Sequence, residues 1–322
     1  MRNHIASLVV GLCGLLAVAA ALGEYPERPV RMIVGFPGGD TTDLVARVVA
    51  PTLGAFLKQP VVVENRPGGN GNIATVRVAK AKADGYTVLL AASSFSTNPS
   101  LYPQSALQPL RDFAPVSRVS VVHNVLVVHA SAPAKTLAQF VAGVRANPAR
   151  TSFASGGKGG VSHLAAELMK MTVGPLNTLH VPYKGNGLAL ADLIGGHVDA
   201  LFAPMPYAFP NVRSGRIRAL AVASPKRAVG LPEVPTFHES GVPGFEAVSW
   251  NAIVAPAGTP YDTIVRLSLG TTQLASVPVF RERIGALGGE LASDTPLELT
   301  EYLRAEIAKW AKVIKAASIT LD

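Results

Sequence analysis

Two glycine-rich stretches contain residues whose types and spacing suit anion binding. "GFPGGDTTD", residues 35–43, follows an apolar run, and "ASGGKGGVSH", residues 154–163, has the same strand–loop–helix character. Glycines allow close backbone approach, and Thr41, Thr42 and Asp43 are residue types that cap helices. Free N–H groups and the helix dipole at such a helix start attract anions. The alternative for each stretch is an ordinary strand–helix connection with a polar cap.

The glycine-rich stretches do not match the motifs of nucleotide binding or acyl transfer. Gly157 and Lys158 are followed by Gly159, where a P-loop needs Ser or Thr. Leu164 stands where a nucleophile elbow has its second glycine. "GGNGN", residues 68–72, lacks the spacing and the acidic residue of a dinucleotide fingerprint. These mismatches argue against a nucleotide cofactor and a serine nucleophile.

The remaining reactive residue types do not form a catalytic set. No carboxylate pair stands out for acid–base chemistry, and the only cysteine is Cys13. The later histidines have neither the i,i+4 spacing nor the HExxH pattern of a metal site: His123, His129, His163, His180, His197 and His238. We therefore expect no cofactor, no metal and no enzymatic activity. A secreted α/β hydrolase-type enzyme and a receptor that feeds a sensor kinase remain as alternatives.

The N-terminus has the pattern of an export signal. Arg2 precedes an apolar run over residues 5–22, and Ala19 and Ala21 form an A-x-A cleavage pattern. We predict a cleaved signal peptide over residues 1–23, with a transmembrane anchor as the alternative. Cleavage would remove the only cysteine, and an exported chain without disulfides is typical of a bacterial periplasm.

Composition predicts a folded protein that does not bind nucleic acid. The chain has 322 residues, of which 48% are hydrophobic and 16% charged, enough for about two domains with a sizeable core. The net charge of +8 is spread along the chain. A nucleic-acid interface would concentrate Lys and Arg together with aromatic residues, so the charge favours anionic ligands only in a general way.

Strand and helix patterns alternate in two successive units. "PVRMIVGF", "QPVVVEN" and "YTVLLAAS" have the pattern of buried strands separated by helices, and a second such unit begins at "NVLVVHASAP". Pro51 should kink or split the first helix. Strand–helix–strand order predicts parallel-rich α/β sheets. We place one lobe over residues 24–121 plus 245–322 and the other over 122–244, with a ligand cleft between them.

Motifs along the whole mature chain resemble the solute receptors of tripartite tricarboxylate transporters, the TctC family or Bug receptors. The motifs include "YPERPVRMIVGFPGG", "QPVVVENRPGGNGNIA", "DGYTVLL", "HVPYKG", "LPEVPTFHESGVPGFE" and "VAPAGTP". The resemblance implies a two-lobed type II periplasmic binding fold that closes on a small carboxylate. It also implies delivery to inner-membrane transporter subunits, and we expect the receptor to be a monomer.

The resemblance also assigns ligand-binding positions. In the family, backbone and hydroxyl groups of the first strand–helix loop and of the second-lobe loop hold the carboxylate. The matching residues are Phe36, Gly38, Gly39, Thr41, Thr42, Asp43, Ser93, Ser94, Asn98, Ser155, Gly156, Gly157, His163, Tyr183, Lys184 and Ala203.

Several positions depart from the family pattern and bear on the ligand. Asp40 stands where a second glycine is usual, Gly160 and Val161 where hydroxyl residues are common, and Asn251 where an aromatic is common. Ala203 replaces a usual Asp, which favours a ligand without an ammonium group. We predict that Asp40 turns outward as a helix cap, because a helix N-terminus stabilises an aspartate. The predicted ligand is then a monocarboxylate or an aromatic carboxylate rather than citrate.

Overall fold

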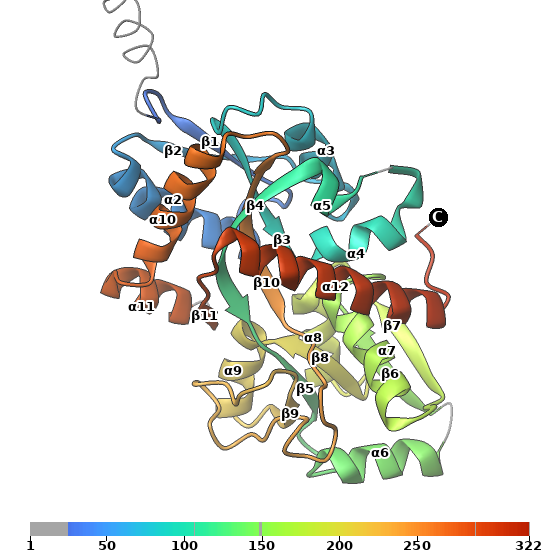
Figure 1. The fold of residues 1–322 in the computed structure, drawn as a ribbon. Helices are drawn as coiled ribbons and strands as arrows, with labels where there is room; N and C mark the ends of the chain where they lie inside the picture. The colour runs from blue at the N-terminus through green and yellow to red at the C-terminus, as the bar shows by residue number, and fades with distance from the viewer. Residues whose placement is uncertain (1–24, 106, 148–149, 287, 322) are drawn as a thin grey trace, which may run out of the picture.

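The structure, a computed structural model, contains two sheets flanked by helices (Figure 1). It describes residues 25–105, 107–147, 150–286 and 288–321, so the predicted signal peptide, residues 1–23, lies outside the described residues. Within the described part, one sheet has six strands in the order β11-β4-β10-β3-β1-β2, and the other has five in the order β7-β6-β8-β5-β9.

The six-stranded sheet combines parallel and antiparallel pairs. β1 is parallel to β2 and β3, whereas β10 is antiparallel to β3 and β4, and β11 is antiparallel to β4. β1 reads "VRMIV" and buries all but one of its residues, as expected for a strand covered on both faces. The strands are β1 (Val30–Val34), β2 (Val61–Asn65), β3 (Thr87–Ala92), β4 (Phe113–Val122), β10 (Ser249–Pro256) and β11 (Gly289–Leu291).

Helices cover this sheet through apolar stripes. In α2, Val45, Val49 and Leu53 are buried against the side chains of β1. The α-helices here are α2 (Thr41–Leu57), α3 (Asn72–Ala79), α4 (Ser94–Leu101), α5 (Pro109–Asp112), α10 (Tyr261–Leu274), α11 (Pro278–Ala286) and α12 (Pro296–Ala316), with short 3-10 turns at η1 (Gly69–Gly71) and η2 (Pro103–Ser105).

The five-stranded sheet is built in the same way. β6 is parallel to β7 and β8, and β5 is antiparallel to β8 and β9. Its strands are β5 (Asn124–His129), β6 (Thr151–Ser155), β7 (Thr178–Pro182), β8 (Ala200–Pro204) and β9 (Ile217–Val222), and its helices are α6 (Leu137–Ala146), α7 (Val161–Val173), α8 (Asn186–Ile194) and α9 (Met205–Arg213).

The chain passes between the sheets along two neighbouring segments. His123 alone separates β4 from β5, and residues 223–248 lead from β9 back to β10. β4 and β10 lie side by side, with β4 running toward the second sheet and β10 running back from it (Figure 1), and Val122 is paired to Ser249.

Helix α12 lies across both sheets (Figure 1). Leu299 and Leu303, in its first half, pack into a core cluster with Ile33 of the first sheet. Trp310 and Ile314, in its second half, belong to the core cluster of the second sheet. The C-terminal segment, which we assigned to the first lobe from sequence, therefore also contributes side chains to the core of the second sheet.

The predicted α/β class, with two sheets flanked by helices, is confirmed. Each sheet mixes parallel with antiparallel pairs. We predicted that Pro51 kinks or splits the first helix; α2 continues through Pro51, so the helix is not split there. Strand β4, which includes Pro115, was not predicted. Across the described residues, every helix is too short or too polar to cross a bilayer.

Candidate functional site

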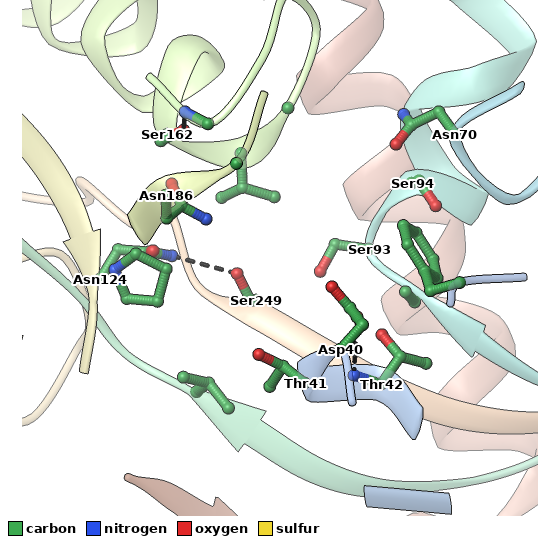
Figure 2. Close-up of a pocket in the computed structure, with 18 of the residues that line it drawn as sticks. Asp40, Thr41, Thr42, Asn70, Ser93, Ser94, Asn124, Ser162, Asn186 and Ser249 are labelled. Carbon is green, nitrogen blue, oxygen red and sulfur yellow. Dashed lines mark hydrogen bonds between the residues drawn. The ribbon is translucent and has the colours of Figure 1, made fainter. Parts of the chain in front are cut away.

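A cavity of about 630 Å³ lies between the two sheets. Five helices begin at its wall, each after the strand that precedes it: α2 after β1, α4 after β3, α7 after β6, α8 after β7 and α9 after β8. Asp40, Thr42 and Ser94 lie on the side of the first sheet, and Ser162 and Asn186 on the side of the second (Figure 2). The carboxyl ends of parallel strands in both lobes thus form one site.

The buried side chain of Asp43 supports the loop between β1 and α2. Its carboxylate accepts hydrogen bonds from the Gly39 N–H at 2.9 Å, Arg47 Nε at 2.8 Å and Asn65 Nδ2 at 2.9 Å. Asp43 is only 1% exposed and is absent from the cavity wall. Burial favours the neutral acid, but the bonds from Arg47, Gly39 and Asn65 outweigh it and lower the pKa of Asp43. Asp43 therefore shapes the loop as a fixed anion.

Asp40 caps helix α2 and also lines the cavity. Its Oδ1 accepts from the Thr42 N–H at 3.0 Å, as expected of an N-cap residue. Its side chain is exposed and lies beside Thr41 and Thr42 in the cavity wall (Figure 2). The predicted cap is present, but the predicted outward position is wrong.

The segment after β3 completes this wall. Ser93 Oγ accepts from the Trp250 N–H at 2.8 Å and so fastens β10, while Ser94 lines the cavity. Asn98 Nδ2 donates to the carbonyl of Asn70 at 3.1 Å, and Asn70 Nδ2 donates to Asn98 Oδ1 at 3.2 Å. Asn98 thus positions Asn70, which lies in the wall with a positive φ of 53°.

The second-lobe loop satisfies its own backbone donors. The N–H of Gly156 donates to Ser162 Oγ at 3.0 Å, and that of Gly157 to Ser155 Oγ at 3.3 Å. The N–H of Gly159 donates to His163 Nδ1 at 3.1 Å. The donors that remain for a ligand are those of the first turns of α7 and α8, which lack intrahelical acceptors. Val161, Ser162, Asn186 and Gly187 in these turns line the cavity.

A stacked histidine pair supports this loop from outside the cavity wall. The rings of His163 and His180 lie 3.7 Å apart and 2° from parallel, and His180 Nε2 is 2.7 Å from Ser155 Oγ. Burial, reinforced by Lys170 and Lys158, lowers the pKa of His163 to about 4. Burial and then the charge of His163 lower the pKa of His180 to about 4. Both rings are neutral at pH 7.

Charged side chains are few in the wall and lie on different lobes. Among the described lining residues, Lys184 is the single basic side chain and Asp40 the single acidic one. Tyr183 next to Lys184 is turned away, because its hydroxyl donates to Asp192 at 2.5 Å. That bond, with burial, raises the pKa of Tyr183 to about 12. The second-lobe wall therefore offers one cation and two helix N-termini to an anion.

The structure brings part of the predicted set together in the wall: Phe36, Thr41, Thr42, Ser93, Ser94, Gly156 and Lys184. The remaining predicted residues lie outside it, in supporting positions or in the core: Gly38, Gly39, Asp43, Asn98, Ser155, Gly157, His163, Tyr183 and Ala203. Ala203 is fully buried in the core cluster of β8, so its side chain does not reach the cavity.

Sequence reasoning missed several polar residues of the wall. They come from η1, α4, β5, the start of α8, α9 and β10, and they are Asn70, Thr97, Asn124, Asn186, Tyr207 and Ser249. Asn251, which the sequence had singled out as a departure that bears on the ligand, also lines the cavity. Asn186 directly follows the quoted "HVPYKG" motif and was within reach of that signal. Ser249 lies on β10, whose pairing with β4 joins segments far apart in the sequence. Among the described residues, no group of three or more His, Cys, Asp or Glu side chains is arranged to hold a metal ion.

Residues 45–319 match the family model described as tripartite tricarboxylate transporter family receptor, TctC. The chain belongs to the TctC family. Among curated proteins, this TctC receptor is similar to protein BugT of Bordetella pertussis, with 38% identity over 98% of this chain and 97% of that protein. It is also 37% identical to an Agrobacterium vitis protein encoded in the TAR-I ttuE–ttuC' intergenic region, over 98% of this chain and 92% of that protein.

Solved structures of the same kind match this TctC receptor over nearly its whole length. The Rhodopseudomonas palustris protein Rpa4515 with adipate has a TM-score of 0.80 and 35% identity, covering 92% of this chain and 100% of that chain. The periplasmic binding protein BugD has a TM-score of 0.77 and 36% identity, with the same coverage. MatC of R. palustris with bound malate has a TM-score of 0.76 and 30% identity, covering 90% of this chain and 100% of that one.

Proposed function

We propose that this protein is a periplasmic, non-enzymatic receptor that binds one small carboxylate between its sheets and delivers it to inner-membrane transporter subunits. One observation carries the proposal. Lys184 and residues of the first turns of α7 and α8 line the cavity between the sheets. Backbone N–H groups at helix starts stabilise an anion, and Lys184 adds a full positive charge.

The ligands of two relatives support this choice of chemistry. One similar structure contains adipate and another contains malate, which are both small carboxylates. The wall of this cavity has no nucleophile with an adjacent base among its described residues, so binding without turnover is the simpler proposal. Export to the periplasm rests on the sequence of residues 1–23 and on the family.

We further propose that residues 24–121 with 245–322 and residues 122–244 act as two lobes. The ligand would contact both walls and so stabilise the closed arrangement by contacts that the open one lacks. Helix α12, which packs on both sheets, would remain a shared support during closure. We expect the receptor to work as a monomer.

Isothermal titration calorimetry with a panel of mono-, di- and tricarboxylates tests this function. A ligand at 100 times its Kd should raise the free energy of unfolding by about 2.7 kcal/mol, which thermal denaturation would detect. Lys184→Gln should weaken binding by roughly tenfold. Lys158→Gln is the matched control, because Lys158 is exposed in the neighbouring loop and does not line the cavity.

Three outcomes would contradict the proposal. The first is that no compound of the panel binds. The second is that Lys158→Gln weakens binding as much as Lys184→Gln. The third is that the bound carboxylate is converted to a product on incubation. The last result would favour the hydrolase-type alternative, and mass spectrometry of the recovered ligand would detect it.

A further inference from the structure

We propose that Gly288 of the first lobe and Met205–Pro206 of the second form a stop that limits how far the ligand cavity opens. The stop lies outside the ligand cavity and sets the affinity for the ligand through the position of the lobes. The inference rests on the two-lobed receptor of the proposed function. Its basis is a second cavity beside the connecting residue His123, together with a close backbone contact in the wall of that cavity.

The two cavities lie on opposite sides of the segment that joins β4 to β5. Val122 and Asn124 line the ligand cavity, whereas His123 between them lines a second cavity of about 810 Å³. Side chains of consecutive residues in an extended chain point to opposite sides. The second cavity, here called the rear cavity, is therefore separated from the ligand cavity by the hinge.

Both lobes contribute to the wall of the rear cavity. The first lobe provides the end of α11 and β11, with residues 285–286 and 288–291. The second lobe provides the start of α9, with Met205, Pro206 and Phe209, and the loop over residues 228–230. Because the hinge lies between the two cavities, a rotation of the lobes that widens the ligand cavity narrows the rear cavity.

Gly288 lies directly against the backbone of the second lobe. A Cβ added to it would lie 2.8 Å from the Pro206 N and 3.1 Å from the Met205 carbonyl carbon, where ordinary contacts are 3.4–4 Å. Both neighbouring atoms belong to the backbone, so rotation of a side chain does not relieve the clash. The rear cavity cannot narrow further at this point, and this contact therefore limits opening of the ligand cavity.

Both sides of the contact are fastened to the hinge. Gly289, which follows Gly288, is paired with Val122 at the end of β4. On the other side, the Met205 N–H donates to the His123 carbonyl at 2.9 Å. Neither backbone can retreat within its own lobe without breaking these bonds, so a larger residue at position 288 is accommodated by rotation of the lobes. Close to the axis of rotation, a small displacement moves the distant parts of the lobes much further.

Calorimetry on Gly288→Asn tests the effect of the stop on affinity. Asparagine tolerates the φ of +65° at this position better than most residues, and its Cβ would hold the rear cavity wider. A receptor whose binding-competent arrangement is partly populated binds more tightly when that population rises. Adipate, malate and citrate are the probes. We expect the probe that the parent protein binds most tightly to bind about three- to tenfold more tightly to the variant.

Gly215→Asn is the matched control. Gly215 has a φ of 72°, but a Cβ there meets nothing within 4 Å, so the substitution brings the same backbone strain without a clash between lobes. Its affinity should equal that of the parent protein. Gly288→Ala adds the same Cβ with the smallest side chain and should also tighten binding. Unchanged or weaker binding in both Gly288 variants, or equal tightening in Gly215→Asn, overturns the inference.

A distance measurement tests the stop without a ligand. Lys226→Cys and Glu282→Cys place one spin label on each lobe, at exposed positions near the rear cavity that line neither cavity. In double electron–electron resonance, the distance between the labels should be longer in ligand-free Gly288→Asn than in the ligand-free parent. An unchanged or shorter distance overturns the inference and leaves the proposed function intact. If none of the three carboxylates binds the parent, the proposed function fails, whereas a longer distance in Gly288→Asn still supports the stop.

Discussion

The side-chain amide of Asn124 donates to the carbonyl of Ala247 at 2.8 Å and so joins the two segments through which the chain passes between the sheets. The Ala223 N–H donates to the Asn124 carbonyl at 2.8 Å, and the Ala247 N–H donates to the Ala223 carbonyl at 3.0 Å. One residue that lines the cavity thus ties the outgoing strand to the returning segment. Bending of the two segments is expected to occur together, about this point.

The first prediction is that ligand binding makes the particle more compact. Contacts from both walls stabilise the closed arrangement, and the paired crossing segments restrict the movement to a hinge. Small-angle X-ray scattering should show a smaller radius of gyration at saturating carboxylate than without ligand. An unchanged radius, in a sample for which calorimetry shows full occupancy, would contradict lobe closure.

The second prediction is that the protein loses stability at acidic pH. An unfolded histidine has a pKa of about 6.5, whereas the pKa values of His163 and His180 in the fold are about 4. The unfolded state therefore binds more protons as the pH falls from 6.5 to 4, and stability is lost across that range. The melting temperature should decline as the pH is lowered from 6.5 toward 4.

Substitution of one ring tests this cause. In His163→Asn the amide oxygen can still accept from the Gly159 N–H, but one titrating group is gone and its charge no longer lowers the pKa of His180, so at least half of the histidine-dependent decline should disappear. His238→Asn is the control, because His238 is exposed. Equal pH dependence in the two variants would show that the stacked pair is not responsible.

The third prediction is that Asp43 supports the site without contacting the ligand. Asp43→Ala removes the acceptor for Gly39, Arg47 and Asn65 and should lower the free energy of unfolding by about 1–3 kcal/mol. Carboxylate affinity should fall as well, because the first loop loses its support. Denaturant unfolding and calorimetry provide the two readouts.

Asp84→Ala is the matched control for Asp43. Asp84 also accepts a backbone bond, from the Tyr86 N–H at 3.0 Å, and pairs with Arg28 near the surface. Its loss should cost less than about 1 kcal/mol and leave affinity unchanged. The role given to Asp43 would be refuted if the two variants had equal effects on binding.

The fourth prediction concerns close packing at Gly156. A Cβ added there would lie 2.6 Å from Asn186 Oδ1 and 2.9 Å from the Asn186 N, so Gly156→Ala should displace the start of α8. Affinity should fall by at least about tenfold, because that helix start provides donors to the ligand. Gly38→Ala, where a Cβ meets nothing within 4 Å, should bind within about threefold of the parent protein. If calorimetry showed equal affinities for Gly156→Ala and Gly38→Ala, the start of α8 would not contribute to ligand binding.

Local sequence pattern predicts the parts of the fold that depend on local physics. The "VRMIV" strand, the capped start of α2 and the strand–loop–helix at residues 151–173 follow from hydrophobic runs and cap residues. The pairing of β10 with β3 and β4 is not a local property, since it joins residues more than 125 apart. That pairing brings Ser249 and Asn251 to the cavity. Sequence reasoning therefore missed Ser249, and it singled out Asn251 only because that residue departs from the family pattern.

The direction of a side chain is also set by tertiary contacts. Asp40 has the sequence context of a helix cap and is one, but whether the capping side chain faces solvent or a cavity depends on the opposite lobe. Tyr183 and Lys184 are adjacent, yet Asp192 holds the tyrosine hydroxyl on one side while the lysine lines the cavity. Neighbouring residues of a loop thus take different roles that composition alone does not distinguish.

The central claim, that one small carboxylate binds between the sheets at the helix starts of the second lobe, is tested most directly by a crystal structure. The protein would be crystallised with the carboxylate that binds most tightly in calorimetry. We predict electron density for that compound in the cavity, with its carboxylate oxygens bonded to first-turn N–H groups of α7 or α8 near Ser162, Lys184 and Asn186. Density for the compound at any other position, with the cavity free of it, would contradict the account.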